Sequence, residues 1–414
     1  MSARGVAEAL REAEQRGLVG DVDSAVILYD LDVLERQVRR VRRSFPDDAW
    51  HAVAIKSNPL ICVLRAMADM NVFAEAASAE EMAVARAAGF GKRIVWDSPA
   101  KTFAEIRAAL ADPPDLINVD SFAELDRYPS GDVRLGLRIN PERRPDTISA
   151  LATGVAGSKF GVPISQRERI HDAYAAESRL TAIHVHSGSN SRSLEPMVDA
   201  VDAVVGLADE INARPATKQR VDTVDIGGGL PYTEDPNDTL SVERYAARLA
   251  ERVPRLFDGT YRIVTEFGRF HHLGAGSTAS RVEYVTTSPE RTHAVIHVGA
   301  DAFVREVYDP AHWQVTFADD ADDAESADDG RGFDVVGPLC FEGDVVARSV
   351  GRSIPEPGEW LVAERTGANT FALWSRHCSR AFPAVLLYRS SDVASTLRVG
   401  KPRESPDDVI AFWS

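Results

Sequence analysis

Lys56 combines a reactive amine with a costly position in the sequence. It follows the apolar run 52–55 and precedes the turn-forming residues Ser57, Asn58 and Pro59. The run predicts a buried strand, where a lysine is expensive unless it is paired or used covalently. Desolvation is expected to lower the pKa of such an amine, and the neutral amine attacks carbonyl groups. The plainer alternative is a lysine whose ammonium group reaches solvent at the end of a strand.

Other chemically capable residues also follow apolar runs that predict strands. They are an acid, an arginine, a histidine with a serine, a glycine triplet, and a second acid with an arginine: Glu75, Arg138, His186 and Ser189, Gly227–Gly229, and Glu266 with Arg269. Each has an ordinary explanation by itself. A glycine triplet is often only a tight turn, a histidine is more often a hydrogen-bonded core residue than a ligand, and an acid next to an arginine can be a simple ion pair.

Taken together, these residues match the needs of pyridoxal 5′-phosphate. Backbone N–H groups of Gly227, Gly228 and Gly229 can cradle a phosphate, with Arg269 and Ser189 as further donors. Glu266 can keep a pyridine nitrogen protonated, and His186 can stack on a flat ring. Lys56 supplies the amine that binds the aldehyde. The combination therefore predicts a site for this cofactor.

Apolar strands and helical segments alternate over most of the chain. Strands are expected near 52–56, 71–75, 93–97, 115–119, 133–139, 181–186, 221–226 and 262–266, and helices at 78–88, 103–110, 195–211 and 242–255. Eight strands that alternate with helices predict an α/β fold, a parallel (β/α)8 TIM-like barrel. Barrel enzymes carry their chemistry at the carboxyl ends of the strands, where the residues above lie.

The pattern changes after about residue 280. Short β-rich runs at 280–287, 293–298, 332–336, 360–363 and 384–388 replace the helical periodicity. They predict a C-terminal antiparallel β-barrel or sandwich domain, an architecture like that of alanine racemase. We expect an N-terminal segment 1–30 that packs with this domain, a cofactor-binding barrel over 31–280, and a β domain over 281–414 with an acidic loop at 318–330.

Composition limits the classes of function. The net charge is −16, which disfavours nucleic-acid binding. The acidic run lacks the glycine spacing of a calcium loop and is interpreted as a solvated surface loop, so no metal site is predicted. No apolar segment approaches the roughly 20 residues of a membrane helix, and no signal peptide is evident. The three cysteines argue against a disulfide framework. We expect a cytoplasmic protein without membrane or nucleic-acid partners.

Several motifs resemble the fold-type III pyridoxal-phosphate decarboxylases, which include diaminopimelate, ornithine and biosynthetic arginine decarboxylases. Residues 54–59 resemble the cofactor-lysine motif, 158–161 (Ser-Lys-Phe-Gly) a motif of the diaminopimelate branch, and 186–189 its His-x-Gly-Ser segment. Residues 227–229 resemble the phosphate-binding glycines and 266–269 the Glu-Pro-Gly-Arg motif, with Phe267 in place of proline. Residues 337–344 resemble the segment with the active-site cysteine. The motifs occur in family order.

The resemblance implies a role for Cys340. It would be the acid that protonates the substrate carbon after CO2 is lost, and in the family this cysteine comes from the partner subunit. A homodimer with shared active sites is therefore implied. The alternative for Cys340 on its own is a small buried apolar residue, because free cysteine is commonly buried.

The sequence differs from the family at the substrate end. An acid normally follows the cysteine and binds the distal amine of the substrate, whereas here Phe341 follows and the acid, Glu342, comes one place later. Asn369 replaces a tyrosine that reaches the cofactor phosphate. Arg305 resembles an arginine that binds a distal carboxylate in the diaminopimelate branch. These differences predict an altered substrate pocket.

The predicted function is pyridoxal-phosphate-dependent decarboxylation of an amino acid, either like diaminopimelate or ornithine or a substrate of specialised metabolism. The products are CO2 and an amine or a decarboxylated amino acid. Two alternatives remain open at this point. One is an amino-acid racemase or epimerase, since alanine racemase has the same domain layout. The other is a non-catalytic relative that only binds the cofactor.

Overall fold

The computed structural model describes residues 3–217, 219–318, 332–351 and 353–414. They fall into two compact units, one of residues 36–271 and one of residues 1–35 with 272–414. The acidic loop expected at 318–330 lies outside the described residues apart from Ala318. In the parts of the chain that the structure describes, the helices lack the combined length and apolar character needed to cross a membrane.

The first unit is a closed parallel barrel, as predicted. Eight of its described strands pair in the order β2-β3-β4-β5-β6-β8-β9-β10, and β10 pairs back with β2. These strands are β2 (Trp50–Ala54), β3 (Phe73–Ala76), β4 (Ile94–Trp96), β5 (Leu116–Val119), β6 (Leu135–Asn140), β8 (Leu180–His184), β9 (Thr223–Asp225) and β10 (Arg262–Glu266). The short β7 (Val162–Pro163) pairs with the end of β6. Each expected strand overlaps an observed one.

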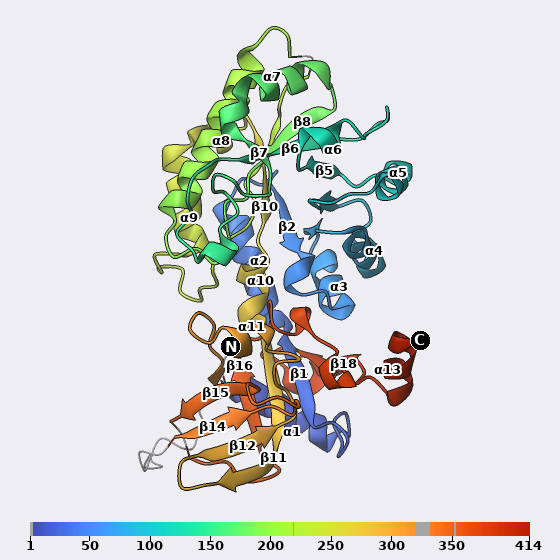
Figure 1. Ribbon diagram of the computed structural model, residues 1–414, viewed down its shortest axis with the longest axis vertical. Helices are drawn as coiled ribbons and strands as arrows, with labels where there is room; N and C mark the ends of the chain where they lie inside the picture. The colour runs from blue at the N-terminus through green and yellow to red at the C-terminus, as the bar shows by residue number, and fades with distance from the viewer. Residues whose placement is uncertain (1–2, 218, 319–331, 352) are drawn as a thin grey trace. The chain divides into compact units, whose positions relative to one another are not determined.

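Helices alternate with these strands, and local sequence signals set their ends. They are α2 (Leu31–Ser44), α3 (Ile61–Asp69), α4 (Ala79–Ala88), α5 (Phe103–Ala111), α6 (Phe122–Leu125), α7 (Arg167–Ala176), α8 (Glu195–Ala213), α9 (Val242–Arg252) and α10 (Arg269–His272). Ser78 caps α4 by accepting from the N–H of Glu81, and Gly89 ends it with a φ of 98°. Thr102 and Glu105 form a capping box on α5. Figure 1 shows α3, α4 and α5 on one side of this unit and α8 and α9 on the other.

The barrel interior changes from apolar to polar along the strands. Ala52, Val95, Leu116, Ala182 and Val264 form a buried apolar cluster. Two residues further along four of these strands stand the polar residues Asp97, Asn118, His184 and Glu266. Residues two apart in a strand face the same side, so the polar set lies on the same inner face, one layer nearer the carboxyl ends.

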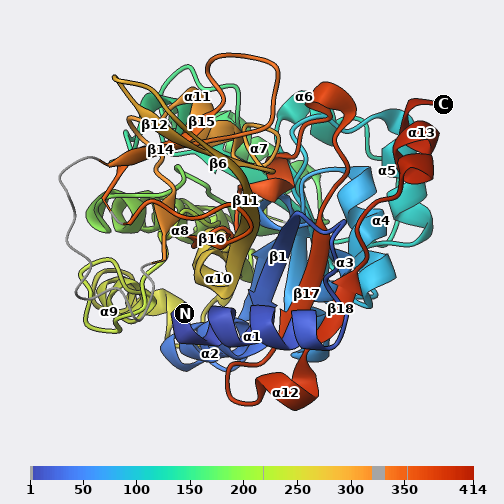
Figure 2. The same cartoon turned by 90° about the horizontal axis from the view of Figure 1, so that it is seen from below.

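The second unit contains a nine-stranded, mostly antiparallel sheet among its described residues. Its strands are β1 (Ala25–Asp30), β11 (Gly276–Thr287), β12 (Thr292–Ile296), β13 (Thr316–Phe317), β14 (Phe333–Val336), β15 (Val345–Val350), β16 (Trp360–Glu364), β17 (Ala384–Tyr388) and β18 (Arg398–Lys401). Its helices are α1 (Ala3–Gln15), α11 (Val304–Tyr308), α12 (Val393–Thr396) and α13 (Pro406–Trp413). Strand β1 pairs with β11 and β17, and β17 pairs with β18, as Figure 2 shows.

A buried ion pair joins the loop after β4 to helix α6 and gives a test of the stability of the barrel. Lys101 Nζ donates to Ser98 O at 2.7 Å, to Asn118 O at 2.8 Å and to Glu124 Oε1 at 2.9 Å. We expect Lys101→Met to lower the free energy of unfolding by about 3–5 kcal/mol, because Glu124 would remain as a buried uncompensated charge. Chemical denaturation of the purified protein measures this loss.

The matched control is Arg167→Met, which removes an ion pair between Arg167 and Glu210 whose side chains are both about half exposed. That change is expected to cost less than about 1 kcal/mol. Equal losses for the two variants would contradict the assignment of Lys101 as a buried structural cation.

Candidate active site at the barrel mouth

Lys56 lies just beyond the end of its strand. Strand β2 ends at Ala54, and Lys56 occupies a single 3-10 turn over Ile55–Ser57, so the expected strand 52–56 is too long. Its Nζ contacts the carboxylate of Glu75, at the corresponding end of the neighbouring strand β3. The Lys56 side chain is 47% exposed, whereas the Glu75 side chain is fully buried. Lys56 therefore has a buried anionic partner.

The expected direction of the Lys56 pKa shift is wrong for the protein alone. Desolvation does lower the pKa of this amine, but the negative charges of Glu75, Glu266 and Asp97 outweigh it and raise the pKa above its ordinary value. The amine is thus held as an ammonium ion by its acidic surroundings. Burial of Lys56 can be predicted from the sequence, whereas the carboxylates around it come together only in the folded barrel.

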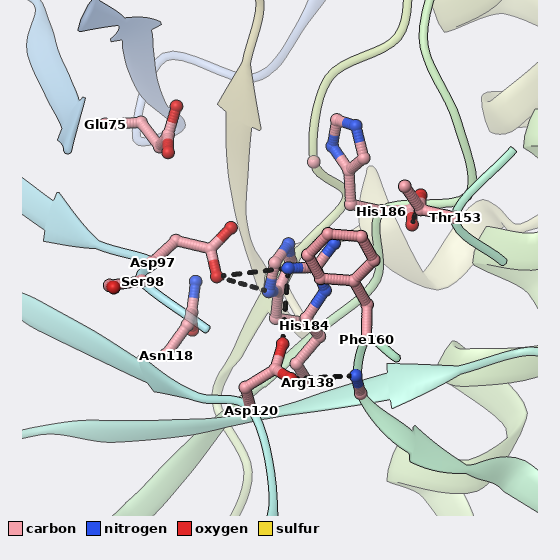
Figure 3. Close-up of polar contacts among 12 residues, drawn as sticks. Glu75, Asp97, Ser98, Asn118, Asp120, Arg138, Thr153, Phe160, His184 and His186 are labelled. Carbon is pink, nitrogen blue, oxygen red and sulfur yellow. Dashed lines mark hydrogen bonds and ion pairs between the residues drawn. The ribbon is translucent and has the colours of Figure 1, made fainter. Parts of the chain in front are cut away.

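A buried arginine organises the next strand ends. Arg138 Nη1 lies 3.6 Å from Asp97 Oδ1 and 3.3 Å from Asp120 Oδ1. The ring of Phe160 lies under its guanidinium, 4.7 Å from the ring centre, and the N–H of Gly161 donates to Asp120 Oδ2 at 3.2 Å. Figure 3 shows Asp97, Asp120, Arg138 and Phe160 converging. These charged residues belong to the polar layer at the carboxyl ends of the barrel strands, which we call the charged layer. The Ser-Lys-Phe-Gly segment contacts this layer through Phe160 and Gly161.

Glu266 is buried without a hydrogen-bonding partner. Among the described residues neither of its carboxylate oxygens accepts a hydrogen bond. His184 Nε2 lies 3.7 Å away, and His184 Nδ1 lies 3.8 Å from Asp97 Oδ1, both too long for hydrogen bonds. Burial, followed by the charges of Asp225 and Asp97, raises the pKa of Glu266 well above its ordinary value. A cationic donor placed against these oxygens would satisfy them.

His186 is held as a neutral ring. Its Nδ1 accepts a hydrogen bond from the N–H of Gly228 at 3.0 Å, so this nitrogen carries no proton. Desolvation, with the positive charges of Arg138 and Lys56, lowers the pKa of His186 well below its ordinary value. Thr153 Oγ1 donates to the carbonyl of His186 at 2.7 Å and fixes its backbone. A neutral, oriented imidazole can stack on a flat ring.

The glycine triplet that follows β9 has no room for side chains. Gly227 and Gly229 have φ values of 66° and 103°, which favour glycine. A Cβ on Gly228 would lie 2.5 Å from the carbonyl oxygen of Glu266, and one on Gly229 would lie 2.2 Å from that of Gly188. The segment is therefore a bare backbone turn packed between the ends of β8 and β10. Two of its N–H groups donate within the protein, that of Gly227 to Asp225 Oδ1 at 2.9 Å and that of Gly228 to His186 Nδ1 at 3.0 Å.

The remaining predicted residues divide between the two units. Ser189 is half-buried after β8, and Arg269 is half-buried at the start of α10. The other five, Arg305, Cys340, Phe341, Glu342 and Asn369, belong to the unit that contains the antiparallel sheet. Cys340 and Glu342 are exposed, and the other three are half-buried. The exposure of Cys340 excludes its alternative interpretation as a buried apolar residue.

Three acids of the charged layer, Asp97, Asp120 and Asp225, were not predicted as site residues. Asp97 and Asp120 directly follow β4 and β5, where those strands were expected, and both are buried. A single aspartate after a strand is common and carries no signal of its own. The barrel assignment could have found them, because it places the residue after every strand at the same mouth.

Comparison with known proteins gives the site its context. Residues 31–272 match the family described as pyridoxal-dependent decarboxylase, pyridoxal binding domain. The chain is 31% identical over 405 residues to the diaminopimelate decarboxylase of Deinococcus radiodurans, covering 97% of this chain and 98% of that protein. It is 27% identical over 397 residues to that of Aquifex aeolicus, covering 92% and 90%.

The chain belongs to the fold-type III pyridoxal-phosphate-dependent decarboxylases. The fold agrees: the structure of Helicobacter pylori diaminopimelate decarboxylase complexed with L-lysine matches this decarboxylase with a TM-score of 0.83, at 23% identity and covering 97% and 98% of the two chains. The decarboxylase therefore uses pyridoxal 5′-phosphate and acts on an amino acid, as predicted. Its barrel mouth fits this cofactor, because it offers an amine, an orphaned carboxylate and a bare glycine turn.

Replacement of Lys56 tests the attachment of the cofactor. We expect the decarboxylase loaded with pyridoxal 5′-phosphate to show a visible absorbance that borohydride bleaches, and Lys56→Ala to lack it because no amine remains to hold the aldehyde. Lys92→Ala, at an exposed position, is the matched control and should behave like the wild type. A bleachable band of normal strength in Lys56→Ala would rule out this lysine.

The pKa of Glu266 makes the stability of the cofactor-free decarboxylase depend on pH. A carboxyl whose pKa is raised on folding keeps its proton in the folded state after the unfolded chain has lost its own, so stability falls as pH rises above about 4.5. Glu266→Gln removes this loss. We expect the variant to be more stable than the wild type by about 1 kcal/mol or more at pH 8 and to be equal to it near pH 4.

Thermal melting across this pH range measures the difference. Glu290→Gln changes an exposed glutamate and serves as the control, with no pH-dependent gain expected. Saturation with pyridoxal 5′-phosphate should stabilise the wild type more than Glu266→Gln, because only the carboxylate can pair with a protonated ring nitrogen. A constant difference between Glu266→Gln and wild type at all pH values would contradict this account.

Proposed function

We propose that this decarboxylase acts on α-amino acids that carry a carboxylate, and no amine, at the distal end. The observation that supports the proposal is the surrounding of Phe341. Its ring stacks on Tyr308 with ring centres 5.9 Å apart and meets His377 edge-on at 6.1 Å. An aromatic cluster therefore stands where the family has an acid that pairs with the distal amine. Burying an unpaired amine there would be unfavourable.

Arg305 supports the carboxylate half of the proposal. It lies three residues before Tyr308 on α11, so the two side chains share one face of the helix. Its guanidinium lies over the ring of Trp313, 5.1 Å from the centre. Desolvation lowers the pKa of Arg305, with Glu306 opposing it. A partly desolvated cation beside aromatic rings gains from an anionic group on the substrate.

The named relatives are compatible with this substrate class. They are diaminopimelate decarboxylases, and diaminopimelate has both an amine and a carboxylate at its distal end. In this protein the distal carboxylate of the substrate would still contact Arg305. The contact to a distal amine would be lost, because Phe341 replaces the acid. Glu342 is exposed and directly follows Phe341, but adjacent side chains point in different directions, so Glu342 would not take the place of the family's acid.

In the proposed mechanism the protein holds the reactants and controls two protons. Bound pyridoxal 5′-phosphate supplies a conjugated ring that takes up the electrons of the bond to CO2. Its holders would be Lys56 at the aldehyde, Glu266 at the ring nitrogen, His186 against the ring, and Gly227–Gly229, Ser189, Arg269 and Asn369 at the phosphate. Glu266 would keep the ring nitrogen protonated. Cys340 would then deliver a proton to the substrate Cα.

A homodimer is part of the proposal. In the family that the motifs resemble, the cysteine segment serves the active site of the other subunit, and residues 337–344 match that segment. A two-fold dimer would place two equivalent Cys340 thiols at two equivalent sites.

A substrate panel tests the proposed function. We expect CO2 release from 2-aminoadipate and 2-aminopimelate to exceed that from lysine and ornithine, with both enantiomers assayed. Phe341→Asp should raise kcat/KM for meso-diaminopimelate about tenfold or more relative to 2-aminopimelate, because a charged hydrogen bond to the amine contributes about 1.5–3 kcal/mol. Tyr284→Asp, on an exposed aromatic of β11, is the control.

The outcomes separate the parts of the proposal. Wild-type preference for meso-diaminopimelate, with no change in Phe341→Asp, would overturn the substrate class and leave decarboxylation standing. Loss of optical rotation without CO2 would instead indicate racemisation.

A further inference from the structure

Two of the three cysteines of the chain lie close together on the unit with the antiparallel sheet. Cys340 follows β14 and Cys378 precedes β17, and both are exposed. The neighbours of these cysteines pack together, since the rings of Phe341 and His377 meet at 81° with centres 6.1 Å apart. Cys62, on α3, belongs to the barrel. The contact between residues 341 and 377 brings the two thiol-bearing backbones side by side.

The loop that carries Cys340 is fastened to the turn after β12. The carboxylate of Asp344 accepts the N–H of Ala300 at 2.7 Å and the N–H of Leu339 at 2.7 Å. The N–H of Gly337 donates to the carbonyl of Asp344 at 2.8 Å. Asp344 is buried, so these bonds close the loop and fix it to residues 299–302.

The loop that carries Cys378 is fastened to the same turn. The N–H of Ser375 donates to the carbonyl of Asp301 at 2.9 Å, and Arg380 donates to the carbonyl of His297 at 3.0 Å. Bonds on both sides of Cys378 therefore hold it against residues 297–301. Because both loops share one anchor, the distance between the two cysteines is set by the fold and not by flexible ends.

The backbone at Cys378 adopts an unfavourable conformation. Cys378 has a φ of 55° and Ser379 a φ of 52°, the left-handed region that side chains other than glycine rarely occupy. Each such residue costs on the order of 1–3 kcal/mol and persists only where its surroundings enforce it. The anchors on both sides of Cys378 are the surroundings that enforce this conformation.

The Cys378 thiol also affects the ionisation of Cys340. A hydrogen bond to the Cys378 sulfur, then its charge and then burial raise the pKa of Cys340 above its ordinary value. The raised pKa agrees with the packing of Phe341 on His377 and with the common anchor of the two loops, which place the second sulfur near Cys340. Two thiols alone do not make a structural zinc site, which takes four ligands.

We propose that Cys340 and Cys378 are a dithiol site that small-molecule disulfides oxidise reversibly to an intramolecular disulfide. One thiolate attacks a sulfur of the small disulfide, forms a mixed disulfide and releases one small thiol. The second thiolate then attacks the mixed disulfide, forms the Cys340–Cys378 bond and releases the second small thiol. The protein loses two electrons and two protons, which the two small thiols carry.

Oxidation would also switch off turnover, and this consequence rests on the proposed function. A sulfur bonded to Cys378 has no proton to deliver to the substrate. The reduced enzyme would be active and the oxidised enzyme inactive, with the fold of the sheet unchanged because the loops already lie together.

The test uses the full-length enzyme loaded with pyridoxal 5′-phosphate in a glutathione buffer in which the reduced form exceeds the disulfide. A lone cysteine stays mostly free in this buffer, whereas two adjacent thiols cross-link because of their high effective concentration. After alkylation, non-reducing peptide mapping should show a peptide joining residues 340 and 378 in wild type and in Cys62→Ser. Cys340→Ser and Cys378→Ser should show no cross-link and free remaining thiols.

Turnover of the substrate that the panel identifies is followed in the same samples. We expect wild-type turnover to fall about tenfold or more as the cross-link forms and to recover with dithiothreitol, while Cys378→Ser keeps its turnover. Alkylation of both Cys340 and Cys378 in wild type, to the same extent as in the single variants, would overturn the dithiol site. A complete cross-link with undiminished turnover would instead sustain the dithiol site and refute the proposed role of Cys340.

Discussion

Burial of more carboxylates than cations at the barrel mouth is the constraint on which the site depends. Among the described residues, the charged layer contains Glu75, Asp97, Asp120, Asp225 and Glu266, against the cations Lys56 and Arg138. Buried charges must be paired or neutralised by protons. Arg138 compensates two of the acids and Lys56 one, whereas among the described residues neither Asp225 nor Glu266 pairs with a lysine or arginine. Asp225 accepts hydrogen bonds from Asn118 and Gly227, but Glu266 accepts none. A ligand with a positive ring nitrogen would supply the missing charge. Cofactor binding would therefore also relieve the unfavourable burial of negative charge in the barrel.

The same constraint explains the pattern of small residues inside the barrel. Asn118 reaches Asp225 through a hydrogen bond of 2.8 Å, and a Cβ on Gly136 would lie 2.3 Å from the Asn118 side-chain oxygen. Gly268 has a similar role, since its Cβ would lie 2.7 Å from Ser57 Oγ beside the turn of Lys56. In this layer, polar side chains have room for their hydrogen bonds where the neighbouring position is a glycine.

Sequence patterns predicted the parts of the fold that depend on local properties. All eight barrel strands were found because strands buried on both faces read as continuous apolar runs. Strands β15 and β18 were missed because their exposed, polar residues interrupt that signal. The insertion of β1 between β11 and β17 depends on contacts between distant segments, which no local pattern encodes. The direction of the Lys56 pKa shift was predicted wrongly for the same reason, because burial can be inferred from the sequence and the facing carboxylates cannot.

The departure from the family at Phe341 lies in a loop whose anchoring explains how the change is tolerated. Asp344 closes residues 337–344 through backbone groups, so the loop conformation does not depend on the side chain at position 341. Phe341 could therefore replace an acid by stacking on Tyr308 without moving Cys340. Under the proposed function, this fixed backbone would separate Phe341, which selects the substrate, from the position of the proton donor Cys340. One residue could then alter specificity while the chemistry of the neighbouring thiol is retained.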